Sequence, residues 1–143
     1  MSVFWGLVVI SLSMLAWVGQ VLSLFAPSAA ARWKLMEKEE DVDPTFWADI
    51  RAEAFWDTLT LWVMAVAGVL LIADVAAWPY FGLVGGGIYF YFGGRGIGTR
   101  VAMTRRGLRI GTPDNVRAGI VFSIIWAAMA LITIAAAVFA LEN

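Results

Sequence analysis

The chain contains four long stretches that carry almost no charge. They cover residues 3–25, 55–73, 75–94 and 118–141, and Asp57 is the only charged side chain within them. A helix needs roughly 20 apolar residues to cross the hydrocarbon core of a bilayer. Of the 143 residues, 62% are hydrophobic, whereas about half is usual in a soluble domain. The sequence therefore predicts an all-α integral membrane protein, with one domain over residues 1–143 that forms an antiparallel bundle of four transmembrane helices.

The ten Lys and Arg residues predict the orientation, because all of them lie in two connections, residues 26–54 and 95–117. We expect spans at about 3–25, 55–73, 77–97 and 118–141, and spans that cross in succession place these two connections on one side. Positive residues are retained on the cytoplasmic side. Both termini should then be outside, on the periplasmic side of a bacterial inner membrane. The first span lacks a basic n-region and is long for a signal peptide, so we expect an uncleaved anchor.

The two cytoplasmic connections carry opposite charge. Residues 26–54 hold four basic and seven acidic side chains, net −3, and residues 95–117 hold six Arg and one Asp, net +5. They could dock on each other, or the Arg-rich connection could meet anionic lipid headgroups. Asp43 and Pro44 are typical of a helix start. The helical spacing of Phe46, Trp47 and Ile50 after them predicts a short amphipathic interfacial helix before the second span.

The chain has no Cys and no His. This excludes haem, zinc or copper bound by the usual imidazole or thiolate ligands, so we predict no cofactor. It also excludes Ser-His and Cys-His nucleophile pairs, and we assign no catalytic residue. The Arg residues are explained by topology, so we expect membrane lipids and no nucleic acid as partners.

The third span is rich in glycine, which lets helix backbones approach closely. The residues expected to pack helices together are Gly82, Gly86, Gly93, Gly94 and Gly98. With so many small residues, we expect part of this surface to bind another chain. The predicted assembly is a homo-oligomer or a subunit of a larger membrane complex.

Charged residues near the inner ends of spans two and three form a candidate polar cluster. Asp49, Glu53 and Asp57 share one helix face, and Arg95 lies at a matching position on the next span. We expect Asp57 to pair with Arg95, and Glu53 to reach toward Arg51 or Arg100. The favoured interpretation is a structural ion pair, because charges in a membrane are costly unless paired. The alternative is a ligand-binding pocket open to the cytoplasm, formed by Arg51, Glu53, Asp57, Arg95 and Arg100.

Two tryptophans, Trp62 and Trp126, fall near mid-membrane. They could line a cavity for a hydrophobic molecule, although packing is the more common role of such residues.

Parts of the chain resemble a known family. The placement of Phe46 and Arg51-Ala52, and the run Tyr91-Phe92-Gly93-Gly94 before Arg95, are similar to motifs of the four-span membrane-associated proteins in eicosanoid and glutathione metabolism. The resemblance implies a four-span fold with a functional polar surface facing the cytoplasm. The family's Asn and Glu positions fall here on Phe55 and Thr58. Small DoxX-like bacterial four-span proteins look about equally similar.

Three classes of function remain. The leading one is a non-catalytic scaffold or accessory subunit of a membrane complex that can hold a hydrophobic molecule or lipid. The second, implied by the resemblance, is a glutathione-transferase-like enzyme that orients an anionic substrate with Arg51, Asp57, Arg95 and Arg100. The third is a small transporter, which the scarcity of polar residues in the spans disfavours.

Overall fold

The computed structural model describes residues 2–142, and every regular element in that range is a helix. The only extended pairing among these residues is an isolated bridge between Val42 and Ile110. The all-α prediction is therefore confirmed. The elements in chain order are α1 (Ser2–Phe25), α2 (Pro27–Arg32), a short 3₁₀ helix η1 (Glu39–Asp41), α3 (Pro44–Thr60), α4 (Trp62–Ile72), α5 (Trp78–Arg105) and α6 (Pro113–Glu142).

Three helical segments are long and apolar enough to cross a membrane. They are α1, the continuous segment Pro44–Ile72 that joins α3 and α4, and α6. The helix α5 is not among them, because its many glycines and its arginines lower its mean hydropathy. Large apolar side chains are exposed on the outside of the molecule, with Phe4 71% exposed and Tyr91 66% exposed. These features are compatible with an integral membrane protein.

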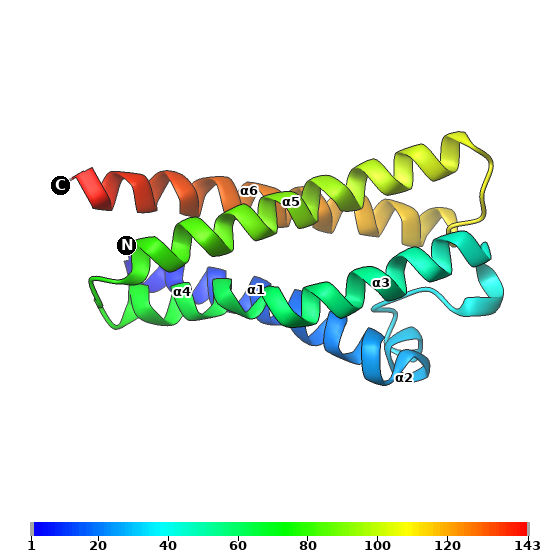
Figure 1. Ribbon diagram of the computed structural model, residues 1–143, viewed down its shortest axis with the longest axis horizontal. Coiled ribbons are helices and arrows are strands. Elements are labelled where there is room, and N and C mark those ends of the chain that lie inside the picture. The colour runs from blue at the N-terminus through cyan, green and yellow to red at the C-terminus, as the bar shows by residue number, and fades with distance from the viewer. Residues whose placement is uncertain (1, 143) are drawn as a thin grey trace.

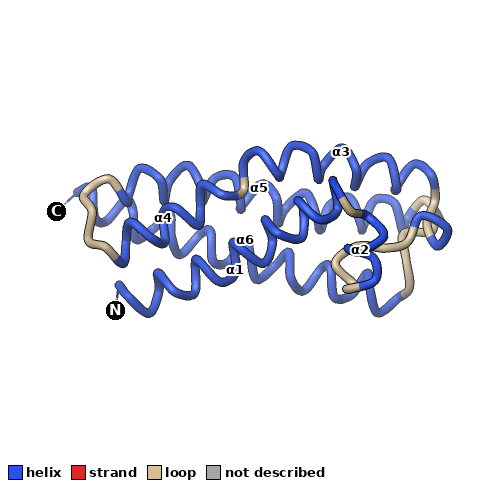
Figure 2. The backbone as a smooth tube through the Cα atoms, turned by 90° about the horizontal axis from the view of Figure 1, so that it is seen from below, coloured by secondary structure: helices blue, strands red, loops and turns tan. Residues whose placement is uncertain are grey.

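The long helices lie side by side along the long axis of the molecule (Figures 1 and 2). The two chain ends and the turn between α4 and α5 gather at one end of the molecule. The helix α2, the segment 33–43 and the connection from α5 to α6 gather at the other end. All ten Lys and Arg residues belong to the half of the molecule that ends in these connections.

The segment before the expected second span differs from the prediction. Residues 44–54 do not form a separate interfacial helix, because they are the first part of α3, which runs on to Thr60 and is interrupted only at Leu61. The start of the helix is as expected. Pro44 occupies its first turn, and the Asp43 carboxylate accepts a hydrogen bond from the Thr45 amide at 2.8 Å. The helix α5 also extends beyond the expected end of the third span, to Arg105.

Three aromatic side chains connect α1 to neighbouring helices by hydrogen bonds to main-chain carbonyls. The Tyr89 hydroxyl on α5 donates to the Ser13 carbonyl at 2.9 Å, and the Trp126 indole on α6 donates to the Leu12 carbonyl at 3.0 Å. The Trp17 indole on α1 donates to the Thr58 carbonyl at 2.9 Å. Because these donors lie in or beside the apolar core, their hydrogen bonds avoid the cost of a buried polar group without a partner.

The two charged connections dock on each other. A small apolar core of Val42, Phe46 and Ile110 holds them together, and the Asp43 amide donates to the Arg109 carbonyl at 2.7 Å. The docking uses apolar and backbone contacts rather than the opposite charges. Four arginines of the second connection and its flanks remain exposed: Arg105, Arg106, Arg109 and Arg117. Docking of the connections therefore leaves these four side chains on the surface of the molecule.

Candidate functional site

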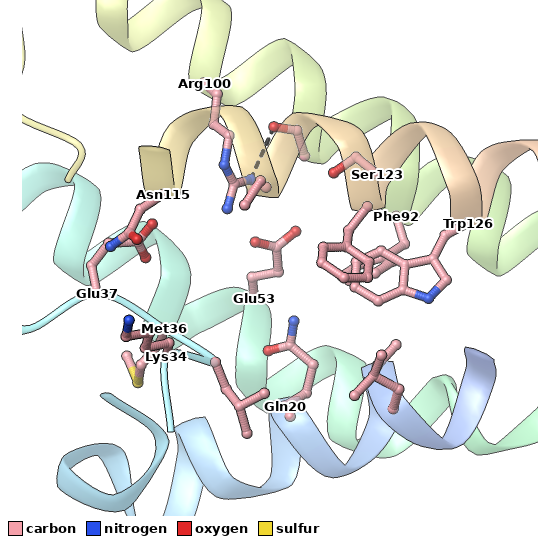
Figure 3. A pocket seen from close by; sticks show the side chains of 18 residues that line it. Gln20, Lys34, Met36, Glu37, Glu53, Phe92, Arg100, Asn115, Ser123 and Trp126 are labelled. Atoms are coloured by element: carbon pink, nitrogen blue, oxygen red, sulfur yellow. Dashed lines mark hydrogen bonds between the residues drawn. The ribbon is translucent and has the colours of Figure 1, made fainter. Parts of the chain in front are cut away.

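A cavity of about 230 Å³ lies between α1 and α6 (Figure 3). Its walls include Leu15 and Gly19 from α1 and Phe122 from α6. Residues of α3 and α5 and the segment 34–37 complete it. It forms here because α6 packs closely along α5, whereas α1 packs along α3 and α4, so the facing sides of α1 and α6 meet at few points.

One part of the cavity is apolar and aromatic. The rings of Phe92 and Trp126 have centroids 5.2 Å apart, and those of Phe122 and Trp126 are 5.5 Å apart. Trp126 therefore both packs and lines a cavity, so the two roles expected for it are combined in one residue. Trp62 does not line this cavity, and its indole donates to the Leu59 carbonyl of the preceding turn.

The other part of the cavity is polar, and it lies toward the end of the molecule that carries the connections (Figure 3). Its polar side chains come from five parts of the chain: Gln20, Lys34, Glu37, Glu53, Arg100 and Asn115. Two of them are cationic and two are carboxylates. The cavity is thus amphipathic, with an aromatic wall on one side and hydrogen-bonding groups of both charges on the other.

Arg100 is placed in the cavity wall by α5. Its guanidinium donates to the Gly96 carbonyl one turn earlier at 3.1 Å, while its buried Nε atom has no hydrogen-bond partner among residues 2–142. Gly119 on α6 allows the guanidinium to lie against the α6 backbone, because a side chain at Gly119 would collide with it. Arg100 therefore keeps unused hydrogen-bonding capacity next to the cavity.

Glu37 begins the mainly acidic run 37–41, yet it is only 8% exposed. Burial raises the pKa of its carboxyl, and this effect outweighs the opposing effects of a backbone hydrogen bond and of Arg100. It is buried because the docked connections bring Gly111 and Asn115 against it. The sequence contains no local signal for this contact, because it joins residues far apart in the chain.

Arg95 does not form the ion pair that we expected with Asp57. It bridges Asp49 at 2.6 Å and Glu53 at 2.8 Å instead. The helix register accounts for part of the difference. Gly85 lies against the Met64 backbone, so ten residues further along α5 Arg95 is level with Ala54, ten residues before Met64. Glu53 is next to that level, whereas Asp49 lies five residues before it and Asp57 three residues after it, so the level alone does not select between the two aspartates.

The five residues of the predicted polar cluster are divided among three places. Glu53 and Arg100 line the cavity, and Glu53 also joins the ion-pair network with Arg95. Arg51 donates to the Ser23 carbonyl of α1 rather than pairing with Glu53. Asp57 lies at a separate groove between α3 and α5. Sequence reasoning missed the contributions of Lys34, Glu37 and Asn115.

The five glycines expected to pack helices fall into two groups. Gly82, Gly86 and Gly93 face α6, where an added methyl group at Gly93 would come within 2.5 Å of the Ser123 carbonyl oxygen. An added methyl group at Gly94 or Gly98 would meet nothing within 4 Å among the described residues. Within residues 2–142 these two glycines therefore lie against no other part of the chain.

Comparisons of the chain with protein-family models, curated proteins and solved structures found no match. The candidate site is thus defined by its own geometry.

Proposed function

We propose that this protein is a four-span membrane protein that holds an amphipathic lipid in the cavity between α1 and α6, as a non-catalytic scaffold or accessory subunit. In this proposal α5 is the fourth span, next to α1, the α3–α4 segment and α6, and neighbouring spans run antiparallel. The connections face the cytoplasm and both termini face the periplasm. Support comes from the position of the ten Lys and Arg residues, which the positive-inside rule places on one side.

The observation that carries the proposal is the amphipathic lining of the cavity. Binding sites for small molecules are mostly apolar and contain a few polar groups that fix orientation. Here Phe92, Phe122 and Trp126 supply the apolar wall, while Lys34 and Arg100 are donors for a polar headgroup. In the proposed orientation the polar part lies toward the cytoplasmic headgroup region and the aromatic part toward the hydrocarbon. A lipid could then keep its ordinary orientation on entering the cavity.

The charged residues at the cavity favour binding of a lipid over its chemical conversion. Glu53 is bound to Arg95 at 2.8 Å, and Arg95 is itself bound to Asp49. The Glu53 carboxylate is therefore already bound by a partner within the chain. Arg100 and Lys34 are suited to binding an anionic group.

The binding proposal can be tested by filling the cavity. Gly19 lines it, and a side chain added there would meet nothing within 4 Å. We expect Gly19→Phe to fold but to lose the lipid that the wild-type protein retains after purification in mild detergent, measured by native mass spectrometry. Val18→Phe is the matched control, because Val18 is the adjacent residue, is 40% exposed and does not line the cavity. Equal lipid retention by the two variants would contradict the proposal.

The proposed topology has a separate test. Because the chain has no cysteine, single cysteines at Ser2 and at Arg106 can be labelled with a membrane-impermeant maleimide on intact cells. We expect labelling at position 2 from outside and labelling at position 106 only after the cells are opened. Labelling of both positions from the same side would rule out this topology.

A further inference from the structure

A second hollow lies on the outside of the molecule, between α3 and α5. It is an open groove whose walls include Trp56, Asp57 and Thr60 from α3, and Val84, Gly87 and Tyr91 from α5. It shares no lining residue with the cavity between α1 and α6. An inference drawn from this groove therefore does not depend on whether the cavity binds a lipid.

Asp57 is the unusual member of the groove. The residue is only 6% exposed, and its Oδ2 atom has no hydrogen-bond partner among residues 2–142. Arg95, which could have neutralised it, is bound to Asp49 and Glu53. An ionisable group within a membrane-spanning segment is costly and usually has a partner. A donor from outside the chain would supply the hydrogen bond that Asp57 lacks.

The face of α5 next to Asp57 is open and can be approached closely. Gly87, Tyr91, Gly94 and Gly98 follow helical spacing along it, and a methyl group added at any of the three glycines would meet nothing within 4 Å. Tyr91 is 66% exposed, and its hydroxyl makes no hydrogen bond within the described part of the chain. Small residues on such a face favour tight helix contacts in membranes.

We propose that a second copy of this chain docks here, α5 against α5, and that Tyr91 of each copy donates a hydrogen bond to Asp57 of the other. Two copies inserted in the same orientation are related by a two-fold axis along the membrane normal, so equivalent residues meet at the same depth. Tyr91 and Asp57 line one groove and are therefore level. Asp57 of one copy lacks a hydrogen-bond donor, and Tyr91 of the other copy supplies one. By symmetry two such bonds form in the same contact.

The first test is disulfide crosslinking, which is clean because the chain has no native cysteine. We expect Gly94→Cys to give a covalent dimer in liposomes under mild oxidation. Ile124→Cys on α6 is the control. Gly93 lies against Ser123 and Ala127, so Ile124 is at about the same depth, and it is 53% exposed on another face. A monomer in liposomes, or crosslinking at Ile124 but not at Gly94, would overturn the proposal.

The second test addresses the hydrogen bond. We expect Tyr91→Phe to weaken dimerisation in liposomes by about tenfold, because the change removes both hydrogen bonds of the symmetric contact and one such bond between membrane helices is worth roughly threefold. Tyr80→Phe is the matched control on the same helix, because Tyr80 is 61% exposed but does not line the groove. Asp57→Leu should weaken dimerisation like Tyr91→Phe, whereas Asp57→Asn keeps an acceptor oxygen and should restore most of the affinity. Equal dimerisation of the two tyrosine variants would show that Tyr91 is not the donor.

Discussion

The helix α6 has two neighbours that it meets in opposite ways. Along α5 it forms a close seam, in which Gly82, Gly86 and Gly93 let the two backbones approach. Toward α1 it leaves a cavity, spanned by large side chains such as Trp126, which bonds the Leu12 carbonyl. Lipid provides no hydrophobic drive between helices, so close packing and hydrogen bonds must hold them. The comparison shows that small residues allow close packing between α5 and α6, whereas large aromatic residues hold α1 and α6 further apart.

The largest loss of stability should come from removing the ion pairs that join α5 to α3. These pairs help to hold α5 in the position in which it packs against α6. Arg95→Met leaves Asp49 and Glu53 without their partner, in side chains that are only 26% and 14% exposed. Removing one partner of a fully buried pair costs about 3–5 kcal/mol, and because these side chains are partly exposed we expect a cost of about 2–3 kcal/mol. Unfolding in mixed detergent micelles, followed by circular dichroism, measures this change.

Arg105→Met is the control for this experiment, because Arg105 is exposed on the same helix. A surface change of this kind should alter the free energy of unfolding by less than about 0.5 kcal/mol. Similar unfolding curves for the two variants would show that the bridge of Arg95 does not stabilise the protein.

A smaller effect should come from the seam itself. Gly93→Ala places a methyl group within 2.5 Å of the Ser123 carbonyl oxygen. Such overpacking costs about 1–3 kcal/mol. The neighbouring variant Gly94→Ala meets open space and should gain about 0.5–1 kcal/mol from the lower flexibility of alanine. If both variants change the unfolding free energy in the same direction, the seam is looser than the structure shows.

The smallest effect on stability should come from Glu37, which lines the cavity between α1 and α6. Because burial raises the pKa of its carboxyl in the folded state, the folded protein holds this proton more tightly than the unfolded chain. Its contribution to stability is therefore fully present below the ordinary glutamate pKa and is lost as the pH rises through the raised value. Glu37→Gln should flatten this part of the pH dependence of unfolding. An unchanged pH dependence would show that Glu37 is solvated.

The helices could be predicted from the sequence because they follow from local patterns. Uncharged runs gave the positions of α1 and α6, and Asp43 with Pro44 gave the start of α3. The partner of Arg95 could not be predicted in the same way. It depends on the register between α3 and α5, which is set where Gly85 packs on Met64, about ten residues away. Asp49, Glu53 and Asp57 all lie within about a turn and a half of the level of Arg95, so the sequence could not single out its partners.

The candidate site was less predictable, because most of its wall is assembled from separate segments. Glu53 and Arg100 could be found as charged residues close to apolar spans. Lys34, Glu37 and Asn115 reach the cavity only because the two connections dock through Val42, Phe46 and Ile110. The two groups of glycines on α5 could not be separated, since only the position of α6 decides which of them are covered.

The side-chain donors that reach α1 have a consequence for how the sequence can diverge. Arg51, Tyr89 and Trp126 come from three different helices, and all of them bond main-chain carbonyls of α1. Every amino acid carries such a carbonyl, so the bonds do not require particular side chains at the accepting positions. In a saturation mutagenesis library we would therefore expect selection at Leu12 to follow only the packing of its side chain against the core, whereas the donors are also selected for their hydrogen bonds.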